Sequence, residues 1–97
     1  MAWTRQPQEQ EGSYFFSGQF YATRATALDL TSAEMLSIYN DVRAFAQEKK
    51  GIDYLQVYTN EQGHKLYFID QLNKEMIESG DYNEEDNHCT LMWAHEY

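Results

Sequence analysis

The stretch that decides the fold is residues 31–70, TSAEMLSIYNDVRAFAQEKKGIDYLQVYTNEQGHKLYFID. Apolar residues recur in its first half at helical spacing and form one stripe. The stripe consists of Met35, Ile38, Tyr39, Val42, Phe45 and Ala46. Thr31 followed by Glu34 is a capping box, and Gly51 is a stop signal. The pattern predicts an amphipathic helix over residues 31–50.

The second half predicts a β-hairpin over residues 53–69, with turn residues at 60–63. In the first run Leu55 and Val57 alternate with Tyr54, Gln56 and Tyr58; in the second, Leu66 and Phe68 alternate with Tyr67 and Ile69. We expect the aliphatic residues of the first run to face the helix. The opposite face of the sheet is then predicted to carry Tyr54, Tyr58 and Tyr67, and an open aromatic face of this kind requires either tyrosines that tolerate solvent or a partner.

The flanking segments complete a single domain. Residues 13–25 favour a strand, residues 70–79 a short helix, and residues 88–97 a last strand. The predicted order is therefore β-α-β-β-(short α)-β, an α+β fold with one main helix packed on a small, mainly antiparallel sheet. Residues 1–13 are polar and aperiodic, so we expect a flexible N-terminal arm ahead of a domain spanning 14–97.

The charge is large and unevenly distributed along the chain. The 97 residues carry a net charge of −9. Residues 1–50 hold five Lys/Arg against six Asp/Glu, whereas residues 51–97 hold two against ten. An acidic surface of this kind repels nucleic acid and anionic lipid and attracts basic proteins. We therefore expect a basic protein partner, no direct contact with nucleic acid and no membrane contact.

Six acids gather shortly before the last strand: Glu75, Glu78, Asp81, Glu84, Glu85 and Asp86. A solvated loop is the plain interpretation of this cluster. A contact with a basic partner is the alternative that the uneven charge favours. Calcium fits poorly, because the segment lacks the alternating oxygen ligands and central glycine of a calcium-binding loop.

A zinc site is the second alternative that the residues leave open. The His and Cys residues of the chain are His64, His88, Cys89 and His95, and four such side chains are the number a structural zinc needs. Their spacing matches no standard zinc finger, and the adjacent His88 and Cys89 would point to opposite faces of a strand. We therefore predict no cofactor, with zinc held by His88, Cys89 and His95 as the alternative.

Three short motifs carry a resemblance: FYATRA at 20–25, DYLQVY at 53–58 and TLMWAHEY at 90–97. Together they resemble a family of small uncharacterised proteins of Gram-positive bacteria, their plasmids and their phages. Trp93 and His95 in the last motif depart from that family's pattern. The resemblance brings no catalytic residues, and phage or plasmid carriage implies a role against host defence. Small size, acidity and a surface rich in aromatic residues are also typical of anti-CRISPR proteins as a class.

The function predicted from the sequence is inhibition by direct contact with a basic, nucleic-acid-binding target, most concretely a Cas nuclease. The chain shows no glycine-rich phosphate loop and no Ser/His/Asp or Cys/His set at a recognisable spacing, so we expect no enzyme activity. A lone cysteine and the absence of a leader or long apolar run predict a cytoplasmic protein, in the host bacterium if a phage encodes it. A homodimer through the tyrosine face stays open.

Overall fold

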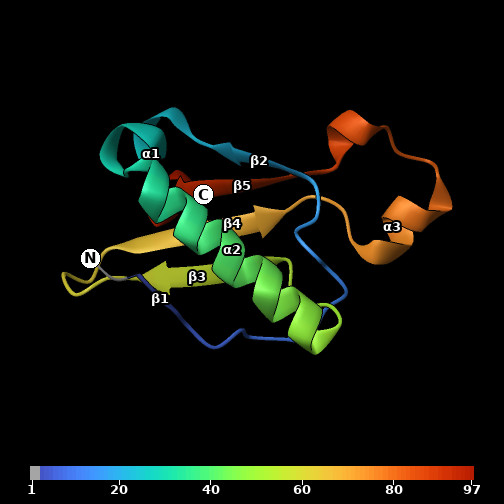
Figure 1. The fold of residues 1–97 in the computed structure, drawn as a ribbon, viewed down its shortest axis with the longest axis horizontal. Helices are drawn as coiled ribbons and strands as arrows, with labels where there is room; N and C mark the ends of the chain where they lie inside the picture. The colour runs from blue at the N-terminus through green and yellow to red at the C-terminus, as the bar shows by residue number, and fades with distance from the viewer. Residues whose placement is uncertain (1–2) are drawn as a thin grey trace.

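The computed structural model describes residues 3–97, apart from the side chain of Glu84, and shows a five-stranded sheet with one long helix on one face (Figure 1). The strands are β1 (Thr4–Arg5), β2 (Gln19–Ala22), β3 (Leu55–Thr59), β4 (Lys65–Asp70) and β5 (His88–Trp93). The helices are α1 (Arg24–Asp29), α2 (Ser32–Lys49) and α3 (Lys74–Ser79), with 3₁₀ turns η1 (Glu84–Asp86) and η2 (Ala94–Glu96). The predicted α+β class is confirmed.

Helix α2 begins and ends where the sequence predicts. The Thr31 hydroxyl accepts a hydrogen bond from the Glu34 N–H, and the Glu34 carboxylate accepts one from the Thr31 N–H, which completes the capping box. Lys50 closes the helix in the left-handed conformation, with φ 57°, just ahead of Gly51. Ile38, Val42 and Ala46 are buried, and Met35, Tyr39 and Phe45 pack against the same core.

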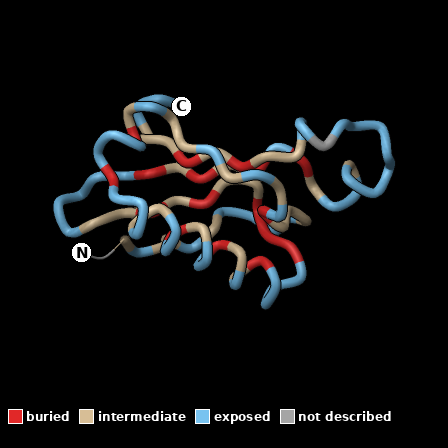
Figure 2. Tube along the Cα trace, turned by 45° about the horizontal axis from the view of Figure 1, so that its top comes forward, coloured by how far each residue is buried: buried red, intermediate tan, exposed pale blue. Residues whose placement is uncertain are grey.

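The strand order β1-β3-β4-β5-β2 explains why one helix is enough to cover the sheet. All pairs are antiparallel except β2 with β5, so β2 and β3 run in the same direction. The connection from β2 to β3 must therefore cross over β5 and β4, and it does so through α1 and α2. Figure 2 shows buried positions on the inner turns of α2 and along the central strands. No helix among residues 3–97 is both long and apolar enough to cross a lipid bilayer.

The face of strand β3 that looks toward α2 is the opposite of the predicted one. Gln56 is 0% exposed and Tyr58 1% exposed, whereas Leu55 and Val57 are half-buried on the uncovered face. The inward side chains find polar partners. Gln56 Nε2 donates to the Asp53 carbonyl at 3.0 Å, and the Tyr58 hydroxyl donates to the Asp41 carboxylate at 2.7 Å. These hydrogen bonds offset much of the penalty for burying the Tyr58 hydroxyl and Gln56 Nε2, while Gln56 Oε1 has no partner among the described residues.

Two further segments differ from the sequence predictions. Residues 3–13 of the predicted arm lie along the domain: Thr4 and Arg5 pair with β3, and Tyr14 bridges to Ile52 at the domain boundary. Residues 1–2 of that arm lie outside the described residues. The predicted strand over 13–25 shortens to β2, because Thr23 caps a new helix, α1, through its hydroxyl.

Asp70 holds together the point where several segments meet. Its side chain is 3% exposed, and Oδ2 accepts a hydrogen bond from the Phe16 N–H at 2.9 Å. Phe16 is fully buried with φ 53°, a conformation that is strained for a bulky residue and needs support from its surroundings. Burial raises the pKa of Asp70 to about 6, against an ordinary value of 3.8, since its backbone hydrogen bonds compensate only in part.

The Asp70→Asn variant is expected to remove a pH dependence of stability. The native carboxyl keeps its proton at pH values where the unfolded chain has lost it. The native state therefore binds more protons between about pH 4 and 6, and stability falls as pH rises through that window. The amide oxygen of Asn preserves the acceptor for Phe16 without titrating. From pH 4 to pH 7 the wild type should lose up to about 3 kcal/mol of unfolding free energy relative to the variant.

Urea unfolding of both proteins at half-unit pH steps measures this difference. Subtracting the unfolding free energy of the variant from that of the wild type at each pH cancels the contribution of the other carboxyl groups. These include Glu34 and Glu96, whose pKa values are lowered by hydrogen bonds to Thr31 and Thr23 respectively. Parallel stability curves for the two proteins would show that Asp70 does not titrate in this way.

Candidate protein-binding surface

The most prominent surface feature is an acidic lobe, residues 73–87, that connects β4 to β5. It contains α3 and η1 and projects beyond the end of the sheet (right side of Figure 1). Its charged residues are six acids and Lys74, a net charge of −5. The projection contributes to the elongated shape of the molecule, whose principal extents are 41 × 26 × 22 Å.

The lobe is attached to the body at its base. Leu72 is buried, and the Asn73 side chain caps α3 by accepting from the Met76 N–H at 2.9 Å. The Lys74 N–H donates to the Ser13 carbonyl at 2.9 Å, and the Ser13 hydroxyl donates to the Glu75 carboxylate at 2.8 Å. These contacts hold the first turn of α3 against the N-terminal segment.

The acids that the sequence analysis singled out are brought together on this lobe. Glu75, Glu78, Asp81, Glu85 and Asp86 are all exposed, whereas the side chain of Glu84 lies outside the described part of the chain. Lys74 approaches Glu78 at 4.0 Å, which is a loose contact between two solvated groups and contributes little energy. The lobe therefore presents carboxylates whose charge is largely uncompensated.

Two exposed apolar side chains on the lobe were missed in the sequence analysis. Ile77 is 40% exposed and Tyr82 47% exposed, and both lie among the acids in sequence. Ile77 also lines an open, mainly apolar hollow with Phe15 and Gln47. Apolar anchors surrounded by charge are a common arrangement in protein interfaces. The signal was present in the sequence, since a tyrosine in a loop of acids has no strand or helix to pack under.

The predicted tyrosine face exists in altered form. Tyr67 is half-buried on the uncovered face of the sheet, and the ring of Tyr97 packs edge-on against it with centroids 5.5 Å apart. The Tyr54 hydroxyl lies 3.3 Å from the Tyr97 hydroxyl, and this hydrogen bond raises the pKa of Tyr54. Tyr97, which is 66% exposed, thus takes the place that the sequence analysis gave to Tyr58.

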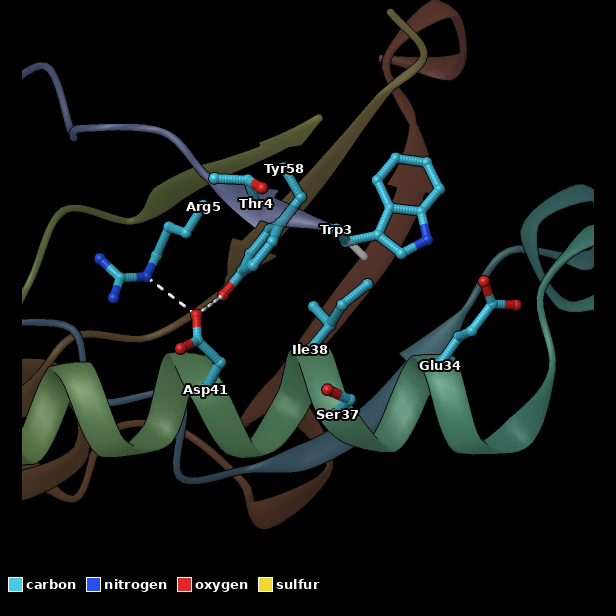
Figure 3. A pocket seen from close by; sticks show the side chains of 8 residues that line it. All are labelled: Trp3, Thr4, Arg5, Glu34, Ser37, Ile38, Asp41 and Tyr58. Carbon is cyan, nitrogen blue, oxygen red and sulfur yellow. Dashed lines mark hydrogen bonds and ion pairs between the residues drawn. The ribbon is translucent and has the colours of Figure 1, made fainter. Parts of the chain in front are cut away.

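The prediction that Tyr58 belongs to the binding surface is wrong. Tyr58 lies under the N-terminal segment, where the Asp41 carboxylate accepts hydrogen bonds from its hydroxyl and from Arg5 Nε (Figure 3). Burial is the main cause that raises the pKa of Tyr58, followed by its bond to Asp41. The three side chains border a pocket of about 520 Å³ between β1 and α2. The polar network explains why β1 is held in place, since Arg5 also stacks on the Phe45 ring at 3.7 Å.

The structure does not bring together His88, Cys89 and His95, the ligands of the alternative zinc site. The Cys89 thiol is buried and donates to the Gln19 carbonyl at 3.5 Å, while the His88 ring packs on Tyr21 on the uncovered side. His95 lies beyond the strand end, stacked near Trp93. Burial raises the pKa of the Cys89 thiol to about 12, so the thiolate that metals require is disfavoured. In the described part of the chain, no three His, Cys, Asp or Glu side chains form a metal-sized group.

The buried position of Tyr58 predicts how substitutions there change the free energy of unfolding. Removing its hydroxyl in Tyr58→Phe should cost about 1–3 kcal/mol, because Asp41 loses a close donor. Tyr58→Ala should cost about 3–5 kcal/mol by leaving a cavity. Tyr67→Phe, on the uncovered face, is the matched control and should change stability by less than about 0.5 kcal/mol. Urea unfolding reports all three values, and a Tyr58→Phe variant as stable as the control would contradict the assigned network.

Comparison with known proteins does not assign the chain to a family. No protein-family model, no curated protein and no solved structure matches the chain. The resemblance to phage and plasmid proteins therefore rests on the three short motifs alone.

Proposed function

We propose that this protein is a small acidic inhibitor that acts by direct contact with a basic, nucleic-acid-binding protein. The observation that carries the proposal is the acidic lobe, a projecting segment of net charge −5 with exposed carboxylates at its surface. A protein groove lined with Lys and Arg, which normally holds a nucleic acid, is the complementary surface.

The target class that we favour most is a Cas nuclease, and the protein would then be an anti-CRISPR inhibitor. Two arguments support this choice: the resemblance to phage and plasmid proteins, and the need of such nucleases for a long basic channel. Acidic side chains in that channel compete with the phosphates of guide or target for the same cations. The protein in this proposal performs no chemistry of its own.

Charged and apolar side chains of the lobe make different contributions to the proposed binding. Long-range attraction accelerates the encounter and is screened by salt beyond about 10 Å at 0.1 M ionic strength. Ile77 and Tyr82 supply desolvated contact area once the lobe has docked. The two contributions predict different kinetic effects, and they can be tested separately.

Charge reversal on the lobe should slow association. The triple variant Glu78→Lys, Asp81→Lys, Glu85→Lys should lower the association rate at least about tenfold and weaken its salt dependence. The matched control reverses three acids outside the lobe, Glu9, Glu48 and Glu61, which are also exposed and give the same net charge.

Surface plasmon resonance against a panel of Cas nucleases, at two salt concentrations, measures these rates, and DNA-cleavage assays report inhibition. An equal effect of the two triple variants would show that only total charge matters. Binding to no nucleic-acid-handling protein in the panel would sink the proposal.

Truncating the lobe anchors should accelerate dissociation instead. In Ile77→Ser and Tyr82→Ala the dissociation rate should rise about tenfold or more, with the association rate within about twofold of wild type. Leu28→Ser is the control, because Leu28 is 77% exposed on α1, outside the lobe. The same binding experiments give both rates. Unchanged dissociation in both lobe variants would exclude Ile77 and Tyr82 as anchors.

A further inference from the structure

The two edges of the sheet are protected to very different degrees. The β1 edge is two residues long, carries Arg5, and is followed closely by Pro7. The β2 edge is four residues long, reads QFYA, and contains neither a charge nor a proline. Natural proteins block exposed edges with short strands, charges and proline, so an unblocked edge is a site for pairing with another strand.

The outer backbone groups of β2 are directed away from its neighbour. The Gln19 N–H donates to the Asn87 carbonyl and the Thr23 N–H to the Leu91 carbonyl, both at 3.0 Å. In a parallel pair alternate residues bond to the same neighbour, so Phe20 and Ala22 direct their N–H and C=O groups to the other side. In Figure 1, β2 forms the upper margin of the sheet, and no other strand of the described residues pairs with its outer side.

The chain segment that contains β2 has no acid of its own, and the Glu96 carboxylate accepts a hydrogen bond from Thr23 at its C-terminal end. Residues 13–28, SYFFSGQFYATRATAL, contain no Asp or Glu and one basic residue, Arg24. The segment thus has a charge of +1, which leaves −10 for the rest of a chain whose net charge is −9. Two copies of such an acidic protein repel each other on most approaches, and β2 itself adds no negative charge to that repulsion.

We propose that β2 pairs antiparallel with β2 of a second copy, so that two sheets join across a twofold axis. With the axis at Tyr21, Phe20 lies opposite Ala22 of the second copy, and each of these pairs exchanges two backbone hydrogen bonds. Such a contact is self-complementary, as a twofold dimer requires. Tyr21, which is 46% exposed, meets its own counterpart across the strands, and aromatic cross-strand pairs are favourable.

Antiparallel rather than parallel pairing follows from the position of the acidic lobe. Gln19 pairs with His88, which directly follows the lobe, so the lobe lies at the N-terminal end of β2. Antiparallel pairing puts the two N-terminal ends, and with them the two lobes, at opposite ends of the joined sheet. Parallel pairing would place two lobes of charge −5 side by side. Electrostatic repulsion therefore selects the antiparallel arrangement.

Sedimentation velocity of the purified protein alone, from about 10 μM to 1 mM, tests the pairing, because a contact this small gives a weak dimer. The test variants are Tyr21→Glu and Tyr21→Lys, each of which sets two like charges against each other on the axis. Thr4→Glu places a charge at the β1 edge, where Thr4 is exposed, and is the control. Circular dichroism confirms that each variant is folded.

Wild type and Thr4→Glu should dimerise over this range, whereas each Tyr21 variant alone should dimerise at least about tenfold more weakly. An equimolar mixture of Tyr21→Glu and Tyr21→Lys should recover the dimer, because opposite charges then meet on the axis. A wild type that stays monomeric to 1 mM would overturn the proposal, including the case in which β2 instead accepts a strand of another protein. Undiminished dimerisation of a Tyr21 variant, or a mixture that stays monomeric, would overturn it as well. No binding partner enters this experiment, so its outcome is independent of the proposed inhibitory function.

Discussion

The hydrogen bond from the Phe16 N–H to Asp70 is the interaction on which the surface features depend. Asp70 ends β4 and pairs with Cys89 of β5, and the following residue, Gln71, donates to the His88 carbonyl. The acidic lobe therefore begins three residues after Asp70, and the chain rejoins the sheet at His88, next to Cys89, the residue that pairs with Asp70. The same bond fixes the turn at Phe16 from which the chain enters β2. One buried side chain thus positions both the lobe and the open sheet edge.

This arrangement also explains why a costly buried carboxyl group fits the site. An apolar residue at position 70 would leave the Phe16 N–H without a partner in the core, and a buried unsatisfied donor costs about 1–3 kcal/mol. Burial raises the pKa of Asp70 instead, so the group is partly neutral near pH 6 while it still accepts the bond. The junction is therefore held by a group whose charge changes in mildly acidic solution. The nearby Gly18 adds a steric constraint, since a Cβ there would lie 2.1 Å from the Asn87 carbonyl oxygen.

The sequence predicted the elements whose pattern is local and failed where polar side chains pair over long distances. Helix α2 and the β3–β4 hairpin follow from periodicity, capping and turn residues, which are all near in sequence. The face of β3 does not, because Gln56 and Tyr58 turn inward only when partners from elsewhere satisfy them. Gln8 accepts a hydrogen bond from Gln56 at 3.1 Å, and Asp41 serves both Tyr58 and Arg5.

The misplaced face and the predicted arm therefore share one physical cause. Polar residues of the N-terminal segment complement polar residues on the inward face of β3, and neither group shows an apolar pattern by itself. The six-residue helix α1 was missed for another reason, since it is too short for helical periodicity to appear. The acidic cluster was found because charge is visible in composition. Of its apolar companions, Tyr82 lay in a loop of acids and could have been found from the sequence, whereas the exposure of Ile77 on α3 is visible only in the fold.

The uneven distribution of acids along the chain makes different parts of the surface differ in charge. If the acids were spread evenly, every face would repel a second copy and no face would attract a basic groove strongly. Concentrating −5 on the lobe raises the local field there, while the segment from residue 13 to 28, which includes the edge strand β2, contributes no acid. The lobe and the edge are adjacent in the fold yet opposite in charge character. A twofold pairing through the β2 edge would place the two lobes at opposite ends of the joined sheet. Each lobe would then be able to contact a basic surface without obstruction by the lobe of the second copy. In that arrangement the same uneven charge that favours the proposed contact between the lobe and a basic partner also restricts where two copies can meet.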